Sequence, residues 1–344
     1  MSGVPVRPGP STAAAVPHAV ESAQQFTRSS AAGHPRRGRG GATRTLLAPA
    51  EPQSYYGRPI LKETVWSTEI PAYLFTGGLA GASASLAAAS ELTGNSELSR
   101  RAWLVALAGV SVSPVLLISD LGRPARFLNM LRVFKVTSPM SVGSWILVAI
   151  SGGVSLAAAR ATLGWFPRLG AAGAAGAGLL GPFLATYTAV LLADTAVPVW
   201  HEAYRELPFV FAASAAASAG AAAAALTPPA SAAPARRLAV AGALLEMATV
   251  EYMERNLGEL GEPYKLGKPK RIARAAKALT LSGAGILGWG GRRSRLLAGA
   301  GAGLIMAGAA AERFAIFEAG KLSARDPKYT VGPQRRRVVA TRGA

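Results

Sequence analysis

The apolar stretches of this chain hold few ionisable side chains, and four of these could bind and protonate a small redox molecule. Glu69 and Tyr73 enter the first apolar block, and Tyr187 and Asp194 lie seven residues apart in the fourth. On a helix this spacing places the phenol and the carboxylate two turns apart on one face. The phenol could donate a hydrogen bond to a quinone oxygen, and the carboxylate could pass on its proton.

Two further ionisable residues extend this interpretation. His201 follows the fourth block, and because a histidine side chain can gain or lose a proton near physiological pH, it could connect Asp194 to water. Glu246 lies deep in the sixth block, where an ionisable group is costly and functional by default. The predicted proton relay comprises Asp194, His201 and Glu246. The predicted quinone contacts are Tyr73, Tyr187 and Glu69.

Structural interpretations of the same residues stay open. Tyr73 and Trp66 could be residues of an interfacial aromatic belt. Asp194 could form an ion pair with Arg123. His201 could be a hydrogen-bonded residue at a helix end, and the sixth block could end in a solvated ion-pair cluster of Glu251, Glu254 and Arg255.

The loop "SDLGRPARFLNMLRVFKVTSPMSVGSWIL", residues 119–147, concentrates charge between the second and third blocks. A helix beginning near Pro124 would be amphipathic, with Phe127, Met130, Leu131 and Phe134 on its apolar side. We expect this helix to lie in the membrane interface, although a basic linker that binds anionic lipid is an alternative. The predicted loop or partner contacts are Asp120, Arg123 and Arg126; Asp120 could instead pair with either arginine.

Composition and block lengths indicate a membrane protein. The 344 residues are 50% hydrophobic, only 16% are charged, and the mean hydropathy is +0.27. Eight apolar blocks approach the ~20 residues that a helix needs to span a bilayer. They cover residues 72–90, 102–119, 140–159, 169–197, 207–226, 238–252, 273–289 and 296–311. We predict an all-α polytopic bundle of about eight transmembrane helices over residues 61–322, with a disordered basic tail at 1–60 and a basic C-terminal tail at 323–344.

The distribution of basic residues predicts the orientation. Lys and Arg number 37 against 18 Asp and Glu, but no nucleic-acid-binding module is recognisable. With eight spans, 28 of these 37 fall on the side of the termini and of the second, fourth and sixth loops, and 9 fall on the other side. Because positive charge marks the cytoplasmic side, we expect both termini in the cytoplasm and the bundle in the plasma membrane.

The chain's own redox chemistry is limited by its composition. It has no cysteine, so it cannot ligate an iron–sulfur cluster through thiolates. A haem between membrane helices needs two histidine ligands. Of the three histidines in this chain, His18 and His34 lie in the tail, so only His201 is near an apolar block. We expect no haem, no cluster and no metal site on this chain, which makes a diffusible quinone the natural redox species.

The charged loop also carries a family resemblance. Its "DLGRP" to "TSPMSVG" segment resembles the NrfD/PsrC family, the integral-membrane subunits of polysulfide-reductase-type and related molybdoenzyme complexes. The stretches "YLFTGGLAGASA", "PFLATYTAVLLADTAVPVWHEAYRELPFVF", "EPYKLGKP" and "ERFAIFEAGKLSARDPKYT" are also similar to that family. The resemblance covers roughly residues 66–329.

This resemblance implies a helical subunit of a respiratory chain that binds menaquinone or ubiquinone and is not catalytic alone. It implies electron exchange with a four-cluster ferredoxin-like iron–sulfur subunit, which is attached to a molybdopterin catalytic subunit. Two other classes stay open, a proton-coupled secondary transporter and a passive membrane anchor. An internal repeat would favour a transporter, but the two halves of the chain show no convincing one. A passive anchor would not need the intramembrane tyrosines and acids.

Overall fold

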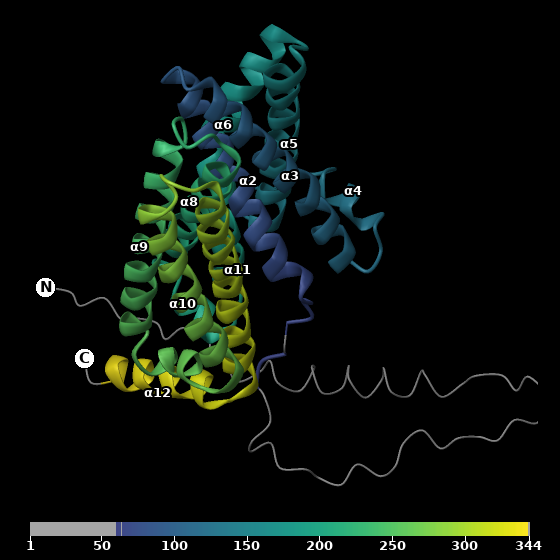
Figure 1. Cartoon of the computed structure of the whole chain (residues 1–344). Helices are drawn as coiled ribbons and strands as arrows, with labels where there is room; N and C mark the ends of the chain where they lie inside the picture. The colour runs from purple at the N-terminus through teal and green to yellow at the C-terminus, as the bar shows by residue number, and fades with distance from the viewer. Residues whose placement is uncertain (1–59, 63, 343–344) are drawn as a thin grey trace, which may run out of the picture. The chain divides into compact units, whose positions relative to one another are not determined.

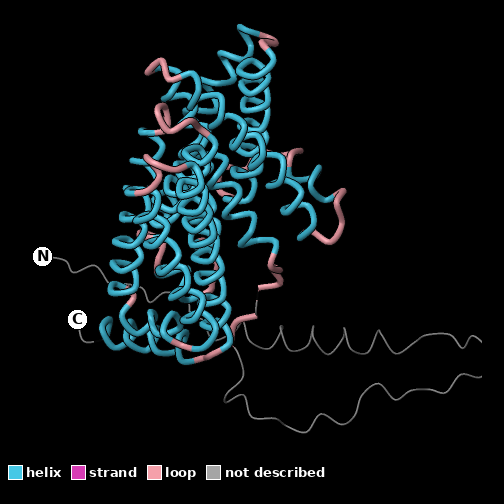
Figure 2. The backbone as a smooth tube through the Cα atoms, viewed as in Figure 1, coloured by secondary structure: helices cyan, strands magenta, loops and turns pink. Residues whose placement is uncertain are grey.

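The computed structural model describes residues 60–62 and 64–342, and every regular element within them is helical (Figures 1 and 2). The basic tail predicted over residues 1–60 lies, apart from Ile60, outside the described residues. The C-terminal segment predicted as a basic tail contains the end of one long helix and a further helix.

Eight long helices occupy the eight predicted blocks. They are α2 (Glu69–Leu92), α3 (Ser96–Asp120), α5 (Pro139–Leu163), α6 (Pro167–Ala193), α8 (Leu207–Leu226), α9 (Ala233–Asn256), α10 (Gly267–Trp289) and α11 (Arg295–Arg325). Six of them are long and apolar enough to cross a membrane; α9 and α10 carry more charge and fall short on composition. The predicted polytopic helical bundle is confirmed.

The long helices pack in two groups. In the first half, α2 lies against α3 and α6, and α5 lies against α6. In the second half, α8 packs on α9, and α10 packs on α11, which also contacts α8. Helix α2 joins the halves because it contacts α8 and α11 as well. Glycine makes the close approach of α2 and α6 possible, since a Cβ at Gly81 or Gly181 would overlap the backbone of the facing helix.

Short elements gather at one end of the bundle. Helix α7 (Pro198–Glu202), the 3₁₀ helix η2 (Gly258–Lys265) and α12 (Lys328–Arg342) contact one another or the ends of the long helices there. Figure 1 shows α12 lying across this end, next to the last turns of α11. Because the long helices alternate in direction, α2 begins and α3 and α6 end on the same side. We call this side the η2 end.

The amphipathic loop helix is present as α4 (Arg126–Met130), but it is shorter than the sequence predicted. The Ser141 hydroxyl accepts a hydrogen bond from the Lys135 amide and donates one to the Val133 carbonyl, both at 3.0 Å. These bonds fold the chain back onto α5, so the helix cannot continue. Phe134 therefore lies beyond α4, where its ring meets Trp145 edge-on.

Helix α11 is longer than its predicted span. The block was expected to end at Ala311, before the charged pair Glu312 and Arg313, but the helix continues to Arg325. Both charged side chains are 1% exposed. The pair that looked like a helix end at the membrane surface is therefore part of the interior.

Candidate functional site

Two tyrosines predicted to contact a quinone meet inside the first half. Tyr73 lies in the second turn of α2 and Tyr187 near the end of α6, and their hydroxyl groups are hydrogen-bonded to each other. Tyr73 has no exposed surface. Each phenol carries one proton, so when one hydroxyl donates to the other, the pair still has one proton to donate to a third group.

The charged loop ends beside this pair. Gly143, the last residue of the "TSPMSVG" segment, lies in the second turn of α5, and a Cβ there would overlap the ring of Tyr187. On the neighbouring side, Thr76 of α2 is hydrogen-bonded at 2.9 Å to Ser113, a buried residue of α3. Four hydroxyl groups from three helices thus form two hydrogen-bonded pairs inside the bundle.

Asp120 fastens the start of α2 to the end of α3. Its carboxylate accepts a hydrogen bond from the Ser67 amide at 3.0 Å and another from the Ser67 hydroxyl. Arg123 and Arg126 are exposed, and neither forms an ion pair with Asp120 within the described part of the chain. The carboxylate therefore positions the helix that carries the half-buried Glu69 and, one turn later, Tyr73.

An aromatic stack joins the two halves at the η2 end. Trp66, just before α2, stacks on Trp200 of α7 at 5.9 Å between ring centroids, and Trp200 stacks on Phe317 of α11 at 5.6 Å. The Trp200 indole also donates a hydrogen bond to the Ile316 carbonyl at 2.8 Å. These contacts fix α7 and the start of α2 against α11.

Asp194 and His201 lie together, but outside the tyrosine pair. Helix α6 ends at Ala193, so Asp194 is exposed at its end, and His201 Nδ1 donates to the Ala193 carbonyl at 3.1 Å. Both side chains line a pocket of about 410 Å³ at the η2 end, with α12 on its other side. Asp194 forms no ion pair with Arg123 among the described residues. Tyr187 is two turns away, about 10 Å along the helix axis.

Glu246 lies in the second half, not with the other predicted relay residues. It is fully buried on α9, and its charge acts on Arg313 and Glu312 of α11. The sequence reasoning did not single out Glu312 or Arg313. A signal was present, because the apolar stretch resumes after them in "AERFAIFEAG", as it would in a helix that continues through the membrane.

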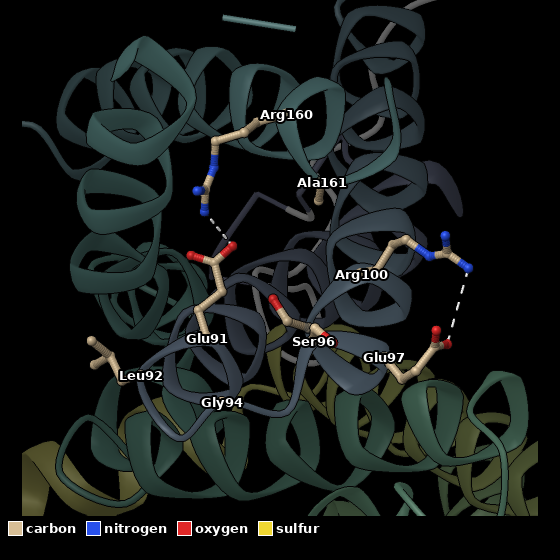
Figure 3. A pocket seen from close by; sticks show the side chains of 9 residues that line it. Glu91, Leu92, Gly94, Ser96, Glu97, Arg100, Arg160 and Ala161 are labelled. Carbon is tan, nitrogen blue, oxygen red and sulfur yellow. Dashed lines mark hydrogen bonds and ion pairs between the residues drawn. The ribbon is translucent and has the colours of Figure 1, made fainter. Parts of the chain in front are cut away.

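A second polar pocket lies at the opposite end of the bundle. It has a volume of about 620 Å³ and is lined by the ends of α2 and α5 and the start of α3. Figure 3 shows Arg160 and Glu91 pointing toward each other, and Arg100 near Glu97. The Arg160 Nη2 and Glu91 Oε1 atoms are 2.5 Å apart. The charges of this pocket are paired. Across the described residues, no group of three or more His, Asp or Glu side chains could hold a metal ion.

Comparison with known proteins identifies the family. Residues 60–250 match the family described as polysulphide reductase, NrfD. No curated protein matches the chain at a significant level. The matched region runs from the start of the described chain to Val250, so it includes the tyrosine pair and the charged loop but not Glu312 and Arg313. Because it covers more than half of the 344 residues, the chain belongs to the NrfD family of membrane subunits of molybdoenzyme complexes.

Proposed function

We propose that this chain is the quinone-reactive membrane subunit of an oxidoreductase complex. It exchanges electrons between the quinone pool and a four-cluster iron–sulfur subunit, which serves a molybdopterin catalytic subunit. The observation that carries the proposal is the hydrogen bond between the buried Tyr73 and the half-buried Tyr187, beside Gly143 at the end of the "TSPMSVG" segment. A passive membrane anchor would not need such a pair at membrane depth.

The tyrosine pair has the hydrogen-bonding capacity that a quinone requires. Its spare hydroxyl proton can be donated to a quinone oxygen, and the apolar helices around it can receive the ring and the isoprenoid tail. Oxidation of a quinol releases a proton for every electron. Asp194 and His201 would receive these protons at the η2 end, where their pocket is open to water. Glu69, at the start of α2, is a second route to the same side.

The basic loops support docking of the iron–sulfur subunit at the η2 end, on the cytoplasmic side. Arg123 and Arg126 are exposed there, and such charges steer an acidic partner surface into place.

The excess of basic residues on the side of the termini supports this orientation. Arg313 is one of the 28 basic residues counted on that side but is buried, and the excess persists without it. A cysteine at the exposed Ala125 should resist a membrane-impermeant thiol reagent in intact cells, whereas one at Ala230, on the opposite side, should react. The reverse pattern would place the complex outside.

The proposal is tested by Tyr187→Phe, which keeps the ring and removes only the hydroxyl group. Quinol-linked turnover of the assembled complex should fall roughly tenfold, as expected for one lost hydrogen bond worth about 1.4 kcal/mol in the transition state. Tyr252→Phe is the matched control, because Tyr252 is 62% exposed on α9 and should tolerate the change. Unchanged turnover in both Tyr187→Phe and Asp194→Asn would contradict the proposed site.

A further inference from the structure

Three ionisable side chains are buried together in the second half of the bundle. Glu246 of α9 is 0% exposed, and Glu312 and Arg313 of α11 are each 1% exposed. They lie in the interior, more than two helical turns from the ends of their helices at Asn256 and Arg325. The proposed quinone chemistry uses none of them.

Arg313 is held in place by α8. Its Nη2 donates a hydrogen bond to the Phe211 carbonyl at 3.0 Å, and its guanidinium carbon lies 3.7 Å from the centre of the Phe211 ring. Its Nε and Nη1 atoms, and all four carboxylate oxygens of Glu246 and Glu312, have no hydrogen-bond partner among the described residues. The two acids act on Arg313 electrostatically, but neither forms a hydrogen bond with it.

Charge counting favours one proton on this group. With all three side chains ionised, the group would carry a net negative charge in an apolar interior, which is strongly unfavourable without hydrogen bonds. Protonation of one carboxylate makes the group neutral overall. A carboxylic acid also has an O–H donor, which an ionised carboxylate lacks.

The groups that face this site come from every element packed around it. Ser214 of α8 lies beside Glu246. Lys277 of α10 and Glu254 of α9 act on Glu312, as does Tyr264 of η2. Burial raises the pKa of Tyr264, so this phenol stays neutral. On the α2 side, a Cβ added at Gly78 would lie 3.9 Å from Arg313 Nη2, and glycine contributes no charge.

A line of charged residues leads from this group to the surface. Side-chain exposure rises from 14% at Glu254 to 32% at Lys277, 50% at Glu251 and 77% at Arg255. The Lys277 Nζ atom lies 3.1 Å from Glu254 and 3.7 Å from Glu251, and Arg255 Nε lies 3.1 Å from Glu251. The ion-pair cluster considered from the sequence therefore exists, and Lys277 connects it toward Glu312.

We propose that Glu246, Glu312 and Arg313 form a proton-binding site, which exchanges one proton with water at the η2 end past Lys277 and Glu254. Release breaks the O–H bond of the carboxylic acid and leaves a carboxylate, and no electron moves. The site belongs to the second half and does not depend on the quinone proposal. Its function would be to take up and release a proton inside the membrane, separately from the tyrosine pair.

Infrared spectroscopy of the purified full-length protein in lipid nanodiscs, without quinone, tests the site directly. A buried protonated carboxyl should give a carboxylic-acid C=O band near neutral pH that shifts in D₂O. The band should disappear in Glu312→Gln or in Glu246→Gln. It should persist in Glu91→Gln, the matched control, because Glu91 is an ion-paired acid at the opposite end.

The wild-type spectrum alone can overturn the proposal, so a variant that fails to fold does not remove the test. Absence of the band at every pH, or its persistence in both glutamine variants, would refute the site. Lys277→Met should slow exchange of the band into D₂O while leaving the band itself in place. An unchanged exchange rate would refute the path past Lys277, and the site would then need another exit.

Discussion

The two halves of the bundle bury polar groups in opposite ways. In the first half, Tyr73 and Tyr187 are neutral and satisfy each other by a hydrogen bond. In the second half, Glu246, Glu312 and Arg313 are ionisable and leave most of their polar atoms without partners among the described residues. A neutral pair positions a ligand at little cost to stability, whereas an unsatisfied charged group is costly and responds to protonation. The halves are therefore suited to different tasks, ligand binding and proton binding.

Removal of Arg313 should destabilise the second half of the bundle, and this is the largest of the expected effects. Arg313→Leu leaves two buried acids without their cation, and removal of one partner of a buried charged group costs about 3–5 kcal/mol. We expect a strongly lowered unfolding temperature in detergent and little assembled protein in membranes.

Arg160→Leu is the matched control for this change. Arg160 forms an ion pair with Glu91, but both side chains are about one-third exposed, so its loss should cost only about 0–1 kcal/mol. Equal destabilisation by the two substitutions would show that the buried group has no special energetic role.

An intermediate effect is expected at Gly143 in the first half. Gly143→Ala places a methyl group against the Tyr187 ring, and overpacking of this kind costs about 1–3 kcal/mol. Quinol-linked turnover should fall with it, because the tyrosine pair is displaced. Gly152→Ala on the same helix meets no atom within 4 Å, so helix propensity should make it neutral or stabilising. Full activity of Gly143→Ala would show that this glycine is not needed to position the tyrosine pair.

The smallest effect concerns α12, which belongs to neither half. Lys328 lies 2.8 Å from Glu262 of η2, and its hydrogen bond lowers the pKa of that carboxyl. A lowered folded-state pKa stabilises the contact above the ordinary pKa of glutamate, and this contribution is lost as the pH falls through the folded value. Amide exchange in α12 should be faster in Glu262→Gln than in the wild type at neutral pH, and the difference should vanish in acid. A difference that persists in acid would rule out this ion pair as its cause.

The sequence predicted the helices better than it predicted the contacts between them. Blocks of about twenty apolar residues are a local signal, and the structure places a long helix in each. Tyr73 and Tyr187 stood out because polar groups are rare at membrane depth, but their contact spans 114 positions. The bond between Ser67 and Asp120 spans 53 positions, and local spacing offered only a pairing of Asp120 with a nearby arginine.

The burial of Glu312 and Arg313 in the second half was not predicted from the sequence for a related reason. A charged pair after an apolar block normally marks the membrane surface, so the sequence predicts a span that ends before Glu312. The structure shows that Arg313 is buried against Phe211, a residue of another helix about 100 positions earlier. The apolar stretch that resumes after Glu312 is a local signal that these charges lie inside, and the packing of Arg313 on Phe211 shows it.

Photoaffinity labelling of the assembled complex with an azido-quinone tests most directly whether the first half holds the quinone. Peptide mapping should place the label on α2, α5 or α6, near Tyr73, Gly143 and Tyr187, and an excess of unmodified quinone should suppress it. Labelling confined to α9 and α11, near Glu246 and Arg313, would contradict the account, because it would put the quinone in the half assigned to proton binding.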